Sequence, residues 1–238
     1  MTTAICFTGT GRSLNYTFEN LKDKLIDRNP NCHVFLHIAE TKHAQKVTKH
    51  FSFDAVKRLV VEKDEQINVS GLNWQPEWPK GLFSGRDPKQ TYLNMLLSRK
   101  KCGDLLSSYA NENNIEYKKV IFSRLDIKYL YNIPRVLDLN SMCVADFHNF
   151  DMVQGAGCND RFAASNFENM KTYFNLYDSI RGLVDQGHLL HGESTLHKHL
   201  SVNNINIKKY FIRFTRIRPN GNSQDDRLRA PDLLARAL

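Results

Sequence analysis

Apolar and polar positions alternate along the first third of the chain in a pattern that predicts strands separated by helices. Residues 4–8 form a short apolar run followed by glycines, which is typical of a buried strand ending in a tight loop. Residues 15–26 carry apolar side chains at helical spacing, and residues 33–38 and 58–62 are strand-like. This succession predicts parallel strands joined by crossover helices, and therefore an α/β fold.

The rest of the chain continues this pattern, with one irregular interruption. Residues 73–88 hold two tryptophans among several prolines and glycines, so they form either a binding loop or a surface excursion. The other expected elements are a long helix at 89–113, strands at 119–127, 142–145 and 161–164, helices at 167–183 and 193–202, and a β-rich segment at 207–217. We expect one domain over residues 1–221 and a polar tail or linker at 222–238, after which additional domains could follow.

The composition is that of a globular protein with an excess of positive charge. Of the 238 residues, 41% are hydrophobic and 24% are charged, which allows a sizeable core. The formal net charge of +8 favours anionic partners such as nucleotides, nucleic acid or acidic glycans, although a solvated basic surface explains it equally well. The five cysteines form no CxxC pair and no apolar run is long enough for a membrane span. We therefore expect reduced thiols and a cytoplasmic location.

The strongest local signal is the strand that ends in Ser123-Arg124-Leu125-Asp126. Ligands of open α/β sheets bind at the carboxyl ends of the strands, where side chains leave the core. A carboxylate at this place can bind a hard divalent cation that also takes diphosphate oxygens. The alternative is a plain salt bridge between Asp126 and Arg124.

The loop after the first strand is a second candidate for ligand binding. Its glycines allow close backbone approach, and the start of the following helix favours an anion. The loop matches neither GxGxxG nor GxxxxGK[ST], so dinucleotide and P-loop chemistry are disfavoured, and an ordinary tight turn is the simpler interpretation. The candidate nucleotide-binding residues here are Thr8, Gly9, Gly11, Arg12 and Ser13.

The order of these segments over residues 4–218 resembles the GT-A class of nucleotide-sugar glycosyltransferases, with Ser-Arg-Leu-Asp where that class carries D-x-D. It is also similar to the chlorella virus glycosyltransferase domain that acts in capsid protein glycosylation, which implies the host cytoplasm for a viral protein. The resemblance implies a mixed, mainly parallel central sheet flanked by helices. It further implies a UDP-sugar donor, transfer of a hexosyl or deoxyhexosyl group to a glycan or glycoprotein acceptor, and Mn²⁺ or Mg²⁺.

The departure from D-x-D leaves only Asp126 as a metal ligand, while Arg124 either contacts phosphate or orients Asp126. The resemblance places Glu193, in the first turn of a helix, near the anomeric carbon, as general base if the enzyme inverts configuration. Compensation of the helix dipole explains an acid at this position equally well. Asp160, which the resemblance places beside the acceptor, is the competing catalytic candidate.

The basic residues near the C-terminus offer further candidates. We expect Arg213, Arg216 and Arg218 to share one face of the last strand, with Arg216 and Arg218 binding phosphate, unless they form a solvated basic edge. Four clustered histidines lack the spacing of a metal motif, and most of them are expected on the surface or partly buried on helices; they are His188, His191, His197 and His199.

Two other functions remain open beside the transferase. A catalytically inactive GT-A-like scaffold would bind a nucleotide without turnover, in keeping with the missing carboxylate at position 124. A basic nucleic-acid-binding module is disfavoured, because lysines and arginines are spread along the chain and most aromatics fall at core spacing. We therefore expect no nucleic-acid partner.

Overall fold

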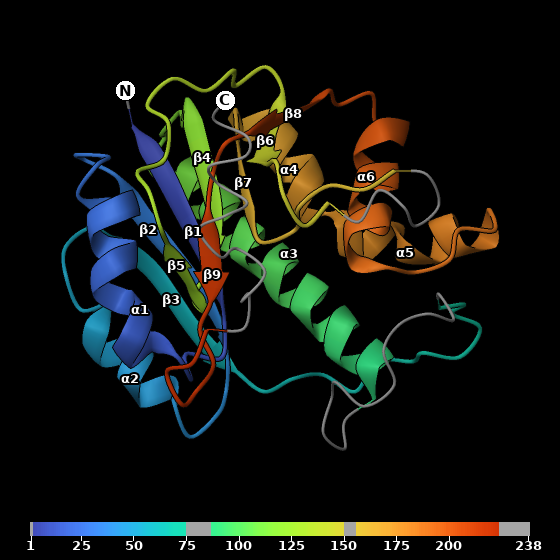
Figure 1. Ribbon diagram of the computed structural model, residues 1–238, viewed down its shortest axis with the longest axis horizontal. Coiled ribbons are helices and arrows are strands. Elements are labelled where there is room, and N and C mark those ends of the chain that lie inside the picture. Colours follow the sequence, from blue (N-terminus) through green and yellow to red (C-terminus); the bar gives the residue numbers. More distant parts are fainter. Residues whose placement is uncertain (1, 75–86, 150–155, 224–238) are drawn as a thin grey trace, which may run out of the picture.

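A seven-stranded sheet forms the centre of the protein, in the strand order β3-β2-β1-β4-β7-β6-β8 (Figure 1). The computed structural model describes residues 2–74, 87–149 and 156–223. Four neighbouring strand pairs are parallel, and the two pairs that include β7 are antiparallel. This mixed, mainly parallel sheet with helices on both faces confirms the predicted α/β architecture and is compatible with a GT-A-like fold. Most of the irregular segment 73–88 and of the tail 222–238 lies outside the described residues.

The elements follow the predicted order. The strands are β1 Thr3–Gly9, β2 His33–Ala39, β3 Val56–Glu62, β4 Lys119–Arg124, β5 Ile127–Tyr129, β6 Met142–Ala145, β7 Phe162–Ser165, β8 Ile207–Tyr210 and β9 Phe214–Arg216. The helices are α1 Leu14–Leu21, α2 Ala44–His50, α3 Pro88–Glu112, α4 Phe167–Phe174, α5 Leu176–Asp185 and α6 Gly192–Val202. A π-helical turn, Lys22–Ile26, continues α1.

The sheet divides the core into two layers. Side chains of β1 alternate between them, so that Ala4 and Cys6 face one layer while Ile5 and Phe7 face the other. Helices α3 to α6 cover the first layer, and α1, α2 and a small second sheet of β5 and β9 cover the other (Figure 1). Burial on both faces explains why β1 reads as a continuous apolar run.

Two predicted elements are interrupted in the structure. The strand expected at 119–127 ends at Arg124, and after a turn β5 pairs with β9 in the second sheet. The amide of Leu125 in that turn donates to Thr8 O at 3.3 Å, which holds the turn against the end of β1. The helix expected at 167–183 breaks at Asn175, whose ψ of 9° ends α4 before α5 begins.

Candidate functional site

Four segments far apart in the sequence meet at the carboxyl end of β4. Because β7 runs antiparallel to β4 and pairs Phe162 with Ser123, the residues just before β7 lie beside the end of β4. The amide of Cys158 donates to Glu193 O at 3.1 Å, which joins this segment to the start of α6. The pairing of β5 with β9 brings Arg216 opposite Ile127. Six side chains form two ion-paired groups here, Arg124–Asp126–Arg216 and Asp160–Arg161–Glu193, whose charges act on each other; together they are called the arginine–carboxylate cluster.

Asp126 is held by arginines. Arg124 donates through Nε and Nη2 to the two carboxylate oxygens of Asp126, at 2.9 and 2.7 Å. Arg216 Nε lies 3.8 Å from Asp126 Oδ2. Burial by itself would raise the pKa of Asp126, but the charges of Arg124 and Arg216 hold it at about 2. Asp126 is therefore ionised at neutral pH, and the structure contains the Asp126–Arg124 salt bridge that the sequence left as an alternative.

Two buried carboxyl groups share one arginine on the other side of the cluster. Arg161 Nη1 lies 3.3 Å from Glu193 Oε1 and 3.7 Å from Asp160 Oδ1. Glu193 is only 4% exposed, and burial together with the charge of Asp160 raises its pKa to about 7. Burial also acts to raise the pKa of Asp160, but Arg161 and Arg99 bring it below its ordinary value. The pKa values of the two carboxyl groups are therefore driven apart: Asp160 is ionised at neutral pH, whereas Glu193 titrates near neutral pH. A pair of acids with separated pKa values is typical of acid–base sites.

Burial lowers the pKa of Arg216 to about 10, and the nearby charge of Arg124 adds to this. Arg218, the other predicted phosphate-binding residue, lies two positions after the end of β9, is partly exposed, and lies near enough to lower the pKa of Arg216 further. The positive charges of this end of the sheet therefore repel one another, which favours an anionic ligand.

Sequence reasoning missed two residues of this region, Arg99 and Arg161. Arg99, 1% exposed on α3, lies 4.9 and 4.7 Å from the rings of Phe122 and Tyr173 and donates to Asp160 O at 3.0 Å. The signal was its position, because Arg99 stands on the apolar stripe of the helix at the spacing of its buried neighbours. A charged residue on a buried stripe calls for a specific partner. Arg161 directly follows the candidate Asp160.

The donor set around Asp126 does not fit a divalent cation. Both of its oxygens already accept charge-assisted hydrogen bonds from Arg124, and a second guanidinium, that of Arg216, lies within 4 Å. Such cations take six or more oxygen ligands. In the described part of the chain no group of three His, Cys, Asp or Glu side chains is arranged to hold a metal ion. The expected Mn²⁺ or Mg²⁺ on Asp126 stays a prediction that this arrangement does not support.

The glycine loop reaches the same end of the sheet, since Thr8 pairs in register with Arg124. Several residues of this loop have structural roles. Gly11 adopts a φ of +66°, and a Cβ atom there would lie 2.2 Å from Val47 Cγ2 of α2. Ser13 Oγ donates to Ile217 O at 2.5 Å, while the side chain of Arg12 is exposed. Gly9 also has a positive φ, of +144°. Their expected nucleotide contacts stay predictions.

The expectation that Arg213 shares a face with Arg216 is wrong. Residues three apart in an extended segment point to opposite sides. The structure accordingly pairs Arg213 with Asp146 and stacks it on Phe147 and Phe211, away from the cluster.

Three of the four clustered histidines contact named groups. His199 Nε2 lies 2.8 Å from Thr172 O and His188 Nε2 lies 3.2 Å from Thr195 Oγ1. His191 Nδ1 lies 3.7 Å from Glu193 Oε2, so this histidine borders the arginine–carboxylate cluster. Burial lowers the pKa of all four, as it does for imidazoles that stay neutral.

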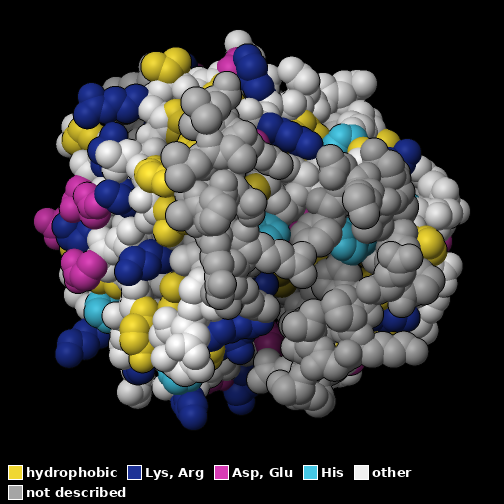
Figure 2. Space-filling view, in the orientation of Figure 1, with side chains coloured by type: hydrophobic (Ala, Val, Ile, Leu, Met, Phe, Trp, Pro, Cys, Tyr) yellow, Lys and Arg dark blue, Asp and Glu magenta, His cyan; other side chains and the backbone are white. Residues whose placement is uncertain are grey.

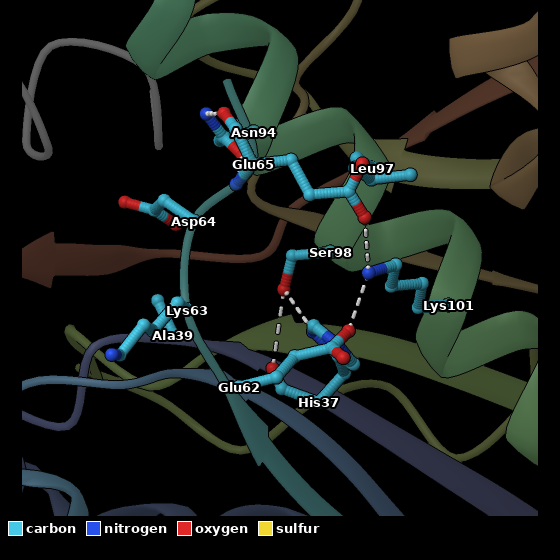
Figure 3. A pocket seen from close by; sticks show the side chains of 10 residues that line it. All are labelled: His37, Ala39, Glu62, Lys63, Asp64, Glu65, Asn94, Leu97, Ser98 and Lys101. Carbon is cyan, nitrogen blue, oxygen red and sulfur yellow. Dashed lines mark hydrogen bonds and ion pairs between the residues drawn. The ribbon is translucent and has the colours of Figure 1, made fainter. Parts of the chain in front are cut away.

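A separate polar network joins α3 to the ends of β2 and β3 (Figure 3). His37 lies 2.8 Å from Ser98 Oγ and 2.6 Å from Glu62 Oε1, and Lys101 bonds both Glu62 and Glu65. The cavity among these groups measures about 10 Å³, room for about one water molecule. The network therefore anchors α3 and offers no space for a substrate.

The surface seen in Figure 2 shows lysine and arginine side chains scattered over the face rather than gathered into one patch. Within the described residues, no helix combines the length and the hydropathy needed to cross a membrane.

Comparison with known proteins matches one family model and finds similarity to solved structures. The family model described as "Domain of unknown function (DUF7796)" matches residues 1–218. No curated protein matches the chain. The crystal structure of the apo-form glycosyltransferase GlyE from Streptococcus pneumoniae TIGR4 is similar with a TM-score of 0.47 and 12% identity, over 87% of this chain and 44% of that one. The chain thus spans less than half the length of GlyE.

Proposed function

The chain belongs to the family described as a domain of unknown function (DUF7796), and from its arginine–carboxylate cluster we propose that it is a glycosyltransferase acting on a nucleotide-sugar donor. The observation that carries the proposal is the pairing of two chemistries at one end of the sheet. Glu193 is a buried carboxyl group with a pKa of about 7, and arginines that can bind a diphosphate lie beside it. General bases work best with a pKa near the working pH.

In the proposed reaction the acceptor hydroxyl attacks the anomeric carbon of the donor sugar. The new C–O bond forms as the bond from that carbon to the diphosphate oxygen breaks, and the electron pair leaves with the diphosphate. Glu193 takes the proton of the hydroxyl group, which raises the nucleophilicity of the oxygen. Arg124, Arg161 and Arg216 stabilise the negative charge on the leaving group. Displacement in one step inverts the configuration at the anomeric carbon.

The finer identity of donor and acceptor comes from the resemblance of the Ser-Arg-Leu-Asp strand end to GT-A enzymes. On that basis the donor is a UDP-sugar carrying a hexosyl or deoxyhexosyl group, and the acceptor is a glycan or glycoprotein. The relationship to the chlorella virus domain is proposed on the same ground. The same resemblance implies a divalent cation on Asp126, but both carboxylate oxygens of Asp126 are already paired with Arg124, so no step of the proposed reaction is assigned to a metal.

The test is release of the nucleoside diphosphate from UDP-, GDP- and dTDP-sugars, measured with purified chain and a panel of glycan acceptors. We expect acceptor-dependent release with one class of donor, and a loss of about 10²–10⁴-fold in Glu193→Gln with donor binding retained. Glu168→Gln is the matched control, because Glu168 also stands in the first turn of a helix but is exposed and pairs with Lys171 in its own helix. If no donor is turned over, or if Glu193→Gln retains the full rate, the proposal is wrong.

A second candidate function is that of an inactive nucleotide-binding scaffold. The observation that favours it is the arginine at position 124, where GT-A enzymes carry a carboxylate, together with the occupied oxygens of Asp126. Binding of UDP without turnover of any UDP-sugar would identify the scaffold.

A further inference from the structure

We propose that the arginines of the cluster, in place of a metal ion, hold the diphosphate of the donor, and that Asp126 is a positioning residue for Arg124 and Arg216. The inference rests on the proposed function and narrows it, since it gives the site a metal-independent mode of binding a nucleoside diphosphate. It reverses the role that the sequence resemblance implies for Asp126.

The geometry of Asp126 suits a positioning residue. Its two oxygens face two nitrogens of one guanidinium, the planar arrangement in which arginine and carboxylate bind most strongly. The backbone of the same residue is fixed as well, because the amide of Ile217 donates to Asp126 O at 2.7 Å. This contact places β9, and with it Arg216, beside the carboxylate. Asp126 thus orients two arginines toward one place.

The balance of charge in the site favours an anion over a cation. In the described part of the site four guanidinium groups, those of Arg99, Arg124, Arg161 and Arg216, accompany three carboxyl groups, those of Asp126, Asp160 and Glu193. A divalent cation would add two positive charges to a region that is already positive, whereas a diphosphate compensates the excess. Arginine is also the residue that binds phosphate oxygens in a bidentate way.

Arg161 carries a buried hydrogen-bond donor that an anion could satisfy. Within the described residues the buried Nε–H of Arg161 has no hydrogen-bond acceptor. Buried donors of charged groups rarely stay unpaired, because desolvation without a partner is costly. The Nη1 of the same side chain lies 3.3 Å from Glu193, so an anion bound by Arg161 would lie next to the proposed base. In an inverting displacement the base and the leaving group stand on opposite faces of the anomeric carbon, so Arg161 would reach the diphosphate on one side and Glu193 would lie on the other.

The experiment measures the affinity of the protein for UDP, with GDP and dTDP alongside, by calorimetry in EDTA and in Mn²⁺. We expect the dissociation constant of the bound nucleotide to change by less than about threefold between the two conditions. Arg216→Gln should weaken binding by about tenfold to hundredfold in both, the range for a lost hydrogen bond to a charged group. Arg216→Lys should recover part of the loss, because it keeps the charge.

Arg58→Gln serves as the control, since Arg58 lies on β3 and pairs with the exposed Glu112. Asp126→Asn separates the two roles of the carboxylate. A positioning residue makes binding weaker to the same degree in EDTA and in Mn²⁺, whereas a metal ligand removes only the part that Mn²⁺ adds. Binding that requires Mn²⁺ overturns the inference and leaves the proposed function standing. Absence of nucleotide binding in both conditions overturns both.

Discussion

Arg124 binds both carboxylate oxygens of Asp126, the residue two positions further along the chain, at the point where the central sheet gives way to the second sheet. This pair joins fold and site in one contact. The turn at Leu125 is tied to the end of β1, and Asp126 is tied to β9. The geometry of the candidate site therefore depends on the same contacts that end β4.

Replacing Asp126 should make the free energy of unfolding less dependent on pH in the acidic range. The folded protein holds the pKa of Asp126 at about 2, below the ordinary 3.8, so its ionised form stabilises the fold above about pH 4. That contribution, about 2 kcal/mol, is lost as the pH falls from about 4 through about 2. In urea unfolding, wild type and Asp126→Asn should differ most at pH 6 and converge toward pH 2. A difference that stays constant with pH would contradict this.

Gly11→Ala should destabilise the protein by about 2–4 kcal/mol, from a strained φ and from overpacking against α2. The φ of +66° is costly for alanine, and the new Cβ would collide with Val47. Gly182→Ala is the matched control, because a Cβ atom there meets nothing within 4 Å in the middle of α5. The control should gain about 0.5–1 kcal/mol. Equal effects of the two substitutions in thermal unfolding would show that Gly11 is not constrained.

The strands and their parallel pairing could be predicted from the sequence because burial on both faces leaves continuous apolar runs such as 4–8 and 33–38. The break at Asn175 could not, since apolar residues continue at helical spacing on both sides of it. The expectation for Arg213 is wrong because Arg213 and Arg216 are three positions apart, and in a strand only residues an even number of positions apart share a face.

The members of the site were easier to predict than their pairing. Asp126, Asp160 and Glu193 stand at strand or helix ends, where a carboxyl group can be noticed from its position alone. Their partners depend on which distant segments meet. Arg161 is placed between two acids by the antiparallel pairing of β7, and no local pattern encodes that pairing.

The activity should rise with pH through about 7. A general base works only when deprotonated, and Glu193 has a pKa of about 7 because burial and Asp160 both raise it. The rate at saturating acceptor and donor should therefore fall about tenfold per pH unit well below that value. Glu193→Gln should lose this limb as well as most of the rate. A profile that is flat from pH 5 to 8 in the wild type would exclude Glu193 as the base.

Removing the charge of Asp160 distinguishes the roles of Asp160 and Glu193. Asp160 raises the pKa of Glu193, so Asp160→Asn should move the midpoint of the pH–rate profile to a lower pH. Asp160→Asn should also reduce the loss of folding stability that accompanies ionisation of Glu193. A carboxyl group whose pKa is raised on folding favours the folded state least when it is ionised, so wild type should lose stability from about pH 4.5 to about 7. This loss should be smaller in Asp160→Asn. If Asp160→Asn abolishes the rate and the wild-type profile is flat from pH 5 to 8, Asp160 is the base, because its pKa lies below the ordinary value, and Glu193 is the residue that positions Arg161.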